Sequence, residues 1–264
     1  MAGQETFTTV NGCKVRLMRG GPENGKAAPL LFLHGAGGAS VWLPFMARLA
    51  QRFDVFVPEH PGFGASDTPD WLDNVGDLAY FYLDLMQALN LSGVHLVGTS
   101  LGGWIAAELA VRDCHKLKSL TLSAPAGIHV KGLSKGDTFM WSREQHTRNL
   151  VHDPALAEKM LAQPLTDEQQ FAWMKNRLTM AKLAWQPRLY NPHLYKWLHR
   201  ISVPTLILWG DGDKVIPAGY GPAFRELIPG SRLEVIANCG HLPQVERMDE
   251  WTGKITGFIG EQAP

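Results

Sequence analysis

The sequence predicts an α/β fold, with a mostly parallel central sheet flanked by helices and interrupted once by a helical insertion. Short apolar runs alternate with segments whose apolar residues recur at helical spacing, which is typical of parallel strands covered on both faces. The alternation lapses over residues 127–202, where helical patches are separated by prolines and no convincing strand is seen. It then resumes. We therefore expect residues 1–126 and 203–264 to form one core domain and residues 127–202 to be an insertion in it.

The expected elements follow one another in a regular order. Strands are expected at ETFTTV (5–10), CKVRLMR (13–19), PLLFLHG (29–35), FDVFVPE (53–59), VHLVG (94–98), LKSLTLSAP (117–125), PTLILWG (204–210) and RLEVI (232–236). Helices are expected at VWLPFMARLAQR (41–52), VGDLAYFYLDLMQALN (75–90), LGGWIAAELAVR (101–112), AFRELIP (223–229) and VERMDEWTGKITGFI (245–259). The first two strands flank Asn11-Gly12, a dipeptide suited to a two-residue hairpin turn.

Composition limits the classes of partner. Lys plus Arg and Asp plus Glu both number 25, and this balance argues against a nucleic-acid partner or an anionic membrane partner. The three cysteines are far apart, which argues against a disulfide framework and a zinc-cysteine site. The first residues show no signal-peptide pattern and no apolar run is long enough to span a bilayer, so we expect a cytoplasmic protein.

A serine between glycines marks the most informative turn. Ser100, in GTSLGG (98–103), lies where a predicted strand gives way to a predicted helix, the context of a nucleophile elbow. The turn is so sharp that side chains at Gly98 and Gly102 would collide with the backbone. The amide of Leu101 would then point to where an oxyanion forms. The alternative is a tight packing corner with a buried serine, because the bare pattern also occurs by chance.

Two further loops at the carboxyl edge of the sheet carry the groups that a serine nucleophile needs. His241 lies between the last predicted strand and the last helix and is the candidate base. Asp211 and Asp213 follow the penultimate strand, and either is a candidate for the acid that orients the imidazole. His34 lies at a comparable edge, but the glycines after it indicate a backbone role. The order serine, acid, histidine is the order of one hydrolase architecture.

The chain resembles the α/β-hydrolase superfamily over nearly its full length, specifically the capped, serine-nucleophile branch of esterases and carbon–carbon hydrolases. The resemblance is carried by HGAGG (34–38), HPGFGASD (60–67), GTSLGG, GDGDKVIP (210–217) and GH (240–241). It implies that Asp213, by the Gly-x-x-Asp-x-x-x-Pro spacing, is the acid, with Asp211 in reserve. It also implies an oxyanion hole from the amides of Ala36 and Leu101, with Gly35 in the same loop.

The resemblance further implies that residues 127–202 form a cap over the site. Glu59-His60 departs from the aspartate that often precedes Pro-Gly in relatives, and we expect this to affect loop anchoring only. Within the insertion, Asn176, Arg177 and Arg188 are candidate polar contacts of a substrate. Four histidines there are weaker candidates, at positions 146, 152, 193 and 199.

These residues together predict an esterase. We expect hydrolysis of a small carboxylic ester through an acyl-enzyme, without a metal or organic cofactor, on a substrate with an apolar acyl or aromatic part. A carbon–carbon hydrolase of aromatic ring-fission products is the alternative enzyme, although Leu242 stands where such enzymes typically carry tryptophan. A non-catalytic small-molecule-binding protein of this fold is the third reading. A homo-oligomer is compatible with the sequence.

Overall fold

A single sheet organises the molecule. The computed structural model describes residues 3–23 and 25–262, so residues 1–2 and 263–264, which end the expected core domain, lie outside the described residues. The described chain forms an eight-stranded sheet in the order β1-β2-β4-β3-β5-β6-β7-β8. Its strands are β1 (Gln4–Val10), β2 (Cys13–Gly20), β3 (Pro29–Leu33), β4 (Asp54–Pro58), β5 (Val94–Thr99), β6 (Leu117–Ser123), β7 (Thr205–Gly210) and β8 (Arg232–Ile236).

The sheet is antiparallel at one edge and parallel elsewhere. β1 and β2 form the expected hairpin, with Asn11 and Gly12 both at positive φ, and β2 also pairs antiparallel with β4. All other pairings are parallel. The carboxyl ends of six strands therefore meet at one edge of the sheet, which is where α/β proteins of this kind place their sites. The expected fold class is confirmed.

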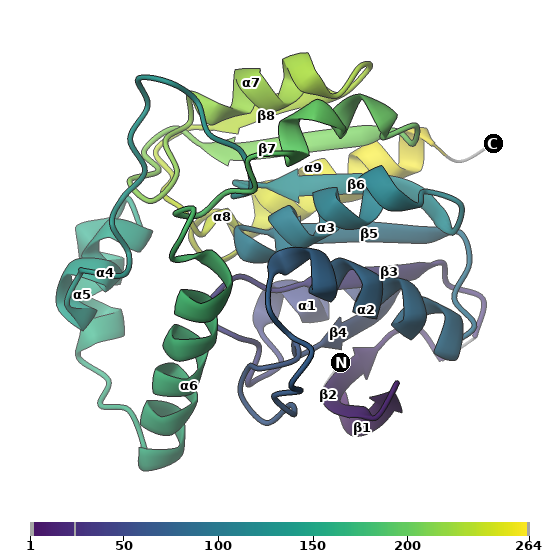
Figure 1. Ribbon diagram of the computed structural model, residues 1–264, viewed down its shortest axis with the longest axis horizontal. Coiled ribbons are helices and arrows are strands. Elements are labelled where there is room, and N and C mark those ends of the chain that lie inside the picture. Colours follow the sequence, from purple (N-terminus) through teal and green to yellow (C-terminus); the bar gives the residue numbers. More distant parts are fainter. Residues whose placement is uncertain (1–2, 24, 263–264) are drawn as a thin grey trace.

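Helices cover both faces of the sheet (Figure 1). They are α1 (Pro44–Leu49), α2 (Val75–Ala88), α3 (Leu101–Arg112), α7 (Tyr220–Leu227), α8 (Pro243–Glu246) and α9 (Met248–Glu261). The residues of α2, α3 and α7 join one buried cluster and those of α1 and α9 join another on the opposite face. The strands feed both clusters alternately, since Leu31 and Leu33 face the first and Leu30 and Phe32 the second.

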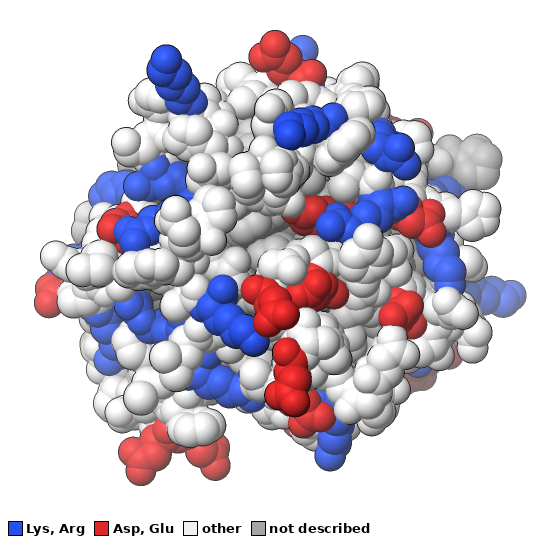
Figure 2. All heavy atoms as spheres, viewed as in Figure 1, with Lys and Arg blue, Asp and Glu red and all other residues white. Residues whose placement is uncertain are grey.

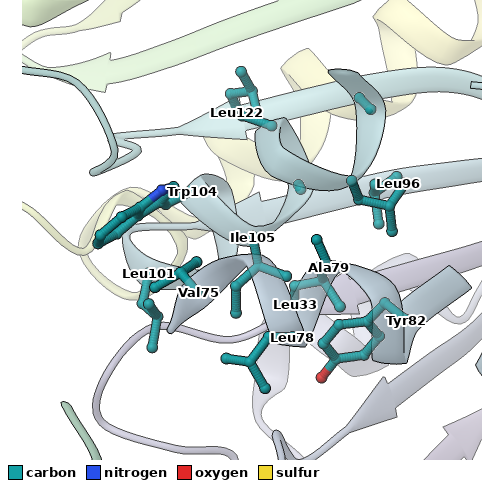
Figure 3. Packing of buried hydrophobic residues seen from close by; sticks show 14 of the residues in the cluster. Leu33, Val75, Leu78, Ala79, Tyr82, Leu96, Leu101, Trp104, Ile105 and Leu122 are labelled. Carbon is teal, nitrogen blue, oxygen red and sulfur yellow. The ribbon is translucent and has the colours of Figure 1, made fainter. Parts of the chain in front are cut away.

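The larger cluster is built from helices with a regular apolar stripe. Leu78 and Tyr82 of α2 and Ile105 of α3 are fully buried and pack between the two helices and the sheet (Figure 3). The start of α2 is set by Asn74, whose side chain accepts from the Asp77 amide while the Asp77 carboxylate accepts from the Asn74 amide. This reciprocal cap satisfies amides that have no partner within the helix.

Three helices differ from the expectation, and one of them is α7, which begins at Tyr220 rather than at Ala223. α1 begins at Pro44 rather than at Val41, because proline is favoured in the first helical turn and restricts the residue before it. The helix expected over residues 245–259 is divided into α8 and α9 at Arg247, whose φ of −130° is not helical.

The segment between β6 and β7 is helical and lies beside the carboxyl ends of the strands (Figure 1). It contains α4 (Arg143–Leu150), α5 (Pro154–Leu161), α6 (Asp167–Ala184) and the short 3-10 helices η1 (Leu194–Lys196) and η2 (Leu198–Arg200). Its one contact of strand type is an isolated bridge between Gly127 and Tyr190.

Within residues 3–23 and 25–262, every helix is too short or too polar to cross a lipid bilayer.

Candidate active site

Ser100 is held on a sharp turn between β5 and α3. Its φ of 53° and ψ of −114° are unfavourable for a residue with a side chain, and such strain is concentrated at functional sites. A Cβ added to Gly98 would lie 2.3 Å from the Gly102 carbonyl oxygen, and one added to Gly102 would lie 2.0 Å from that of Leu33. The expected backbone collisions are therefore present, and both positions require glycine.

The structure brings Ser100, His241 and Asp213 together from three separate loops. The Ser100 Oγ lies 2.9 Å from His241 Nε2, and His241 Nδ1 lies 2.7 Å from Asp213 Oδ2. Because a carboxylate only accepts hydrogen bonds, Nδ1 carries the proton and Nε2 offers its lone pair to the hydroxyl. The imidazole and carboxylate are buried, whereas Ser100 is partly exposed. This arrangement can take a proton from the serine as its oxygen attacks.

The two candidate acids have different surroundings. The Oδ1 of Asp213 accepts hydrogen bonds from the amides of Val215 and Ile216, at 2.8 and 2.9 Å, which fixes Oδ2 toward the imidazole. Asp211 is exposed, and its Oδ1 instead accepts from the Cys239 amide at 3.2 Å. Asp211 therefore braces the loop that precedes His241 and does not contact the imidazole.

The expected oxyanion donors lie beside Ser100. Leu101 is the first residue of α3, so its amide has no acceptor within the helix. Among the described residues the Ala36 amide has no acceptor either. The Gly35 backbone passes close to the elbow, because a Cβ there would lie 3.4 Å from the Ser100 Cβ. Two backbone donors are thus available next to the hydroxyl.

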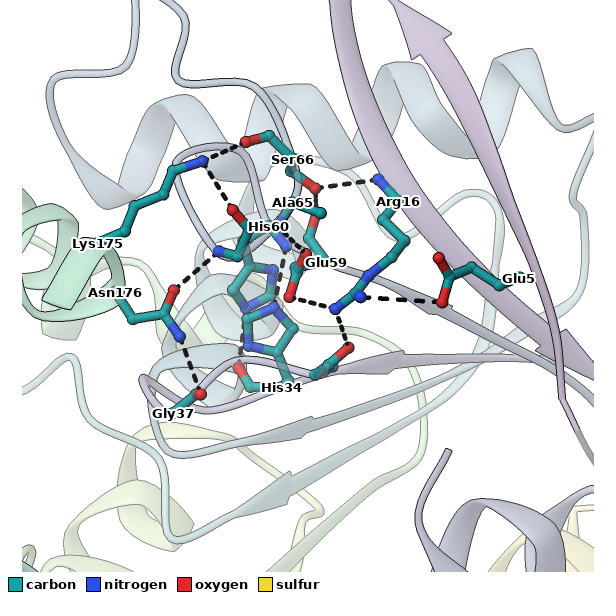
Figure 4. A network of polar contacts seen from close by, with 12 residues as sticks. Glu5, Arg16, His34, Gly37, Glu59, His60, Ala65, Ser66, Lys175 and Asn176 are labelled. Atoms are coloured by element: carbon teal, nitrogen blue, oxygen red, sulfur yellow. Dashed lines mark hydrogen bonds and ion pairs between the residues drawn. The ribbon is translucent and has the colours of Figure 1, made fainter. Parts of the chain in front are cut away.

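A buried polar network holds the loops behind these donors (Figure 4). The Glu59 side chain accepts from Arg16 Nη2 and from the Ala65 amide, each at 2.7 Å, and Arg16 also donates to the Ala39 carbonyl. Burial raises the pKa of Glu59, and Arg16 opposes that rise. Glu59 anchors the loop over residues 60–67, in agreement with the role expected for this departure from the family pattern.

Two stacked histidines complete the network. The rings of His34 and His60 lie 3.6 Å apart, His34 Nε2 accepts from the His60 amide, and His60 Nε2 donates to the His34 carbonyl. His60 Nδ1 accepts from the Tyr82 hydroxyl. Each ring has one donating and one accepting nitrogen and is therefore neutral. Burial lowers the pKa of His34 to about 4 and that of His60 in the same direction.

This neutrality makes stability depend on pH. In the unfolded chain His34 takes up a proton near its ordinary pKa of 6.5, whereas in the folded chain it does so only near 4. The contribution of neutral His34 to the free energy of unfolding is thus complete above pH 6.5. About 3 kcal/mol of it is lost as the pH falls toward 4. We expect urea unfolding to show this loss, and to show less of it in His34→Gln, which keeps a donor and an acceptor but does not titrate. Parallel pH profiles for the two proteins would contradict the prediction.

One face of α6 docks onto the same loops. Asn176 Nδ2 donates to the Gly37 carbonyl at 3.0 Å and its Oδ1 accepts from the Gly64 amide at 2.9 Å. The neighbouring Lys175 donates to the Gly64 and Ser66 carbonyls (Figure 4). Asn176, a candidate substrate contact, lines the cavity described next, but its amide group is engaged by backbone groups and joins the insertion to the core.

A cavity of about 280 Å³ lies between the insertion and the loop that carries Ala36. Its lining residues are Ala36, Gly37, Thr138, Phe139, Arg143, His146, Thr147, Leu150, Met160, Leu165, Trp173, Asn176, Arg177 and Met180. It adjoins the elbow through the backbone at Ala36, while Ser100 itself is not part of its wall. Most of the wall is apolar, and no carboxylate is included.

The other candidate substrate contacts in the insertion differ in whether they line the cavity. Arg177 lines the cavity and donates to the Phe139 carbonyl at 2.8 Å. The expectation for Arg188 is wrong, because this residue lies outside the cavity, paired with Asp137 and packed over the Trp185 ring. Of the four histidines only His146 reaches the cavity, where burial lowers its pKa to about 4.

A carboxylate that the sequence analysis missed ties the insertion to the histidine loop. The Glu246 side chain accepts from the amides of Gly240, His152 and Asp153, at 2.6, 2.6 and 2.7 Å. The His241 amide in turn donates to the Leu150 carbonyl at 2.8 Å. One feature of the sequence could have indicated Glu246. It is an acid in the first turn of the helix that follows the histidine, a position where carboxylates commonly accept from free amides.

Comparison with known proteins places this geometry in a family. Residues 30–253 match the profile of the "Alpha/beta hydrolase family". The chain belongs to this family. As an alpha/beta hydrolase it shares the core fold of the family, and the family resemblance drawn from its motifs is confirmed. Within the described residues no group of three His, Cys, Asp or Glu side chains is arranged to hold a metal ion.

Relatives of this alpha/beta hydrolase have more than one chemistry. Lipase 1 of Psychrobacter immobilis is 29% identical over 89% of this chain and 78% of the lipase. The 2-hydroxy-6-oxo-6-(2'-aminophenyl)hexa-2,4-dienoic acid hydrolase of Metapseudomonas resinovorans is 26% identical over 98% of this chain and 92% of that enzyme. The crystal structure of a membrane phospholipase A superposes with a TM-score of 0.79 at 28% identity, covering 99% of this chain and 87% of that one. These similarities support a hydrolase and leave the bond that it cleaves open.

Proposed function

We propose that this alpha/beta hydrolase is a serine hydrolase that cleaves a small carboxylic ester through an acyl-enzyme intermediate. One observation carries the proposal: the continuous hydrogen-bonded chain from Asp213 through His241 to Ser100, at 2.7 and 2.9 Å. A hydroxyl is a poor nucleophile at neutral pH, and an aligned base with its own orienting acid is what activates it.

Acylation follows from this geometry. His241 Nε2 takes the Ser100 proton as Oγ attacks the ester carbonyl carbon, and Asp213 stabilises the imidazolium that forms. The negative charge on the former carbonyl oxygen is met by the amides of Ala36 and Leu101, and each such donor contributes about 3 kcal/mol to transition-state stabilisation. His241 then gives the proton to the leaving alcohol oxygen, and the carbon–oxygen bond breaks.

Deacylation uses the same groups in reverse. His241 takes a proton from water, whose oxygen attacks the acyl carbon. The proton then returns to Ser100 as the acid product leaves. The apolar cavity beside Ala36 is suited to the acyl or aromatic part of the substrate, since its wall includes Phe139, Leu150 and Trp173. Neither half of the reaction requires a metal or an organic cofactor.

The first experiment separates an enzyme from a non-catalytic binder. A fluorophosphonate probe should label Ser100 rapidly, with the site identified by peptide mass spectrometry. Labelling should disappear in Ser100→Ala. Absence of labelling in the folded wild-type protein would favour the binder.

A substrate panel separates the two hydrolase chemistries. We expect turnover of p-nitrophenyl esters of short acyl chains to exceed that of a vinylogous 1,5-diketone, the substrate type of carbon–carbon hydrolases. The carbon–carbon alternative is kept because Arg143 and Arg177 line a cavity without a carboxylate, which would suit an anionic substrate. The dienoic acid hydrolase among the relatives acts on such an acid by its name. Preference for the diketone would reverse the choice.

Glu246 provides a test of how the base is positioned. We expect Glu246→Ala to lower kcat by about 10- to 100-fold, because three amides around the histidine loop lose their acceptor and the imidazole moves from its place. Steady-state kinetics on a p-nitrophenyl ester would measure it. Glu250→Ala, which removes an exposed acid from the same C-terminal region, is the matched control. Equal kcat values for the two variants would contradict the role given to Glu246.

A further inference from the structure

Helix α6 has an apolar face that is largely exposed, although Arg188 packs over the ring of Trp185 at its end. One face carries Asn176 and docks on the core loops, and a second carries Trp173 and Arg177 and lines the cavity. The third face is apolar and exposed. Its members are Phe171, Met174, Leu178 and, directly after the helix, Trp185, with exposed fractions of 70%, 56%, 71% and 45%. We call these four residues the α6 stripe.

The spacing of the α6 stripe is that of a helix-pairing seam. Its members fall at i, i+3, i+7 and i+14, with Ala181 in the remaining i+10 position. Apolar residues at alternating spacings of three and four form the contact line between paired helices. The stripe spans about 21 Å at 1.5 Å per residue. Exposed apolar side chains that line up along a helix are a candidate interaction surface.

We propose that the α6 stripe is the interface of a homodimer, in which α6 packs antiparallel against α6 of a second copy. A twofold axis beside position 176 places Phe171 opposite the small Ala181 and Met174 opposite Leu178. The large side chains of the central layers thus meet small or medium ones, as a self-complementary interface requires, whereas Trp185 falls opposite Asp167 at the end of the stripe. This inference is independent of the reaction that the protein catalyses.

Charge along α6 fits the antiparallel arrangement. Asp167 and Glu168 lie at the start of the helix and Lys182 lies near its end. Figure 2 shows acidic side chains at the lower end of α6 and basic ones farther along it. Antiparallel pairing brings the acids of one copy near Lys182 of the other, whereas parallel pairing would bring like charges together. The ion pair of Lys182 with Asp73, at 3.4 Å, is exposed and weak, so Lys182 can change partner.

A lipid surface is the other occupant to consider. Residues 127–202 contain eleven Lys and Arg against six Asp and Glu, which would favour an anionic membrane. However, Arg148 and Arg188 are already paired with carboxylates. Asp167 and Glu168 lie within a turn of Phe171 and would be pressed against the headgroups. Since charges are screened beyond about 8 Å at physiological salt, these neighbouring acids outweigh the distant excess of base.

The experiment measures association of the full chain. Four exposed residues form a small interface, and weak, transient complexes are found at the small end of the range of interface sizes. Sedimentation velocity over about 1 to 300 µM should therefore show a concentration-dependent dimer. Leu178→Glu should raise the dissociation constant at least tenfold. Val235→Glu, which changes an exposed apolar residue on the edge strand β8, should leave it unchanged. Thermal unfolding would verify that both variants are folded.

A charge exchange tests the direction of the helices. Glu168→Lys and Lys182→Glu should each weaken the dimer several-fold, and the double variant should restore it. A wild-type protein that stays monomeric throughout would overturn the proposal. So would a dimer lost in Val235→Glu but kept in Leu178→Glu. Binding of the monomer to phosphatidylglycerol vesicles, abolished by Leu178→Glu, would also overturn it in favour of a lipid surface.

Discussion

Replacement of Ser100 by Ala is expected to reduce ester hydrolysis to a trace, with kcat lower by about 10⁶-fold, as when the nucleophile of a serine triad is removed. The variant loses only the oxygen that would attack the carbonyl. Alanine has the same Cβ as serine, so the strain at a φ of 53° is unchanged and we expect the amides of Ala36 and Leu101 to stay in place. Stopped assays with a p-nitrophenyl ester would measure the loss.

The control for this experiment is another serine. Ser134→Ala removes an exposed hydroxyl from the insertion and should leave kcat unchanged. Both variants should unfold at the temperature of the wild type within a few degrees, about the shift that 1 kcal/mol produces in a domain of this size. If Ser100→Ala retained a substantial fraction of the wild-type turnover, the acyl-enzyme mechanism would be wrong.

Asp213→Asn is expected to lower kcat by about four orders of magnitude through the wrong imidazole tautomer. The amides of Val215 and Ile216 donate to Oδ1, so the side-chain oxygen of the asparagine stays on them and its NH₂ group is turned toward His241. A donor at that position takes the lone pair of Nδ1. The proton then moves to Nε2, which no longer accepts from Ser100.

Asp211→Asn is the matched comparison two residues away. Its side chain accepts from the Cys239 amide, and the asparagine oxygen can keep that bond. Little change in kcat is expected. If this variant were inactive and Asp213→Asn were active, the assignment of the acid would have to be exchanged. Burst kinetics at several pH values would distinguish a slower acylation step from a smaller active fraction.

The sequence was most informative where the constraint is local. Strand and helix alternation depends on residues near in sequence, and the glycines at 98 and 102 are required by a turn only a few residues long. The family resemblance, through the spacing within its motif, also favoured Asp213 over Asp211. All of these features depend on residues that are close together in the sequence, and so they were predictable.

Contacts between distant segments were not predictable in the same way. Asn176 appeared suited to a substrate, but it bonds to backbone groups more than a hundred residues away. Glu246 has partners in both the histidine loop and the insertion, and only the folded chain brings them together. Arg188 was misplaced because the direction of a side chain after α6 depends on how the insertion packs.

The hydrogen bond from the His241 amide to the Leu150 carbonyl couples the position of the base to the insertion. At this point the loop that carries the imidazole is bonded directly to the end of α4. A motion that lifted the α4–α5 end would have to break this bond and those of Glu246, or move the histidine loop with it. We therefore expect this corner of the insertion to stay joined to the histidine loop while the base is in place.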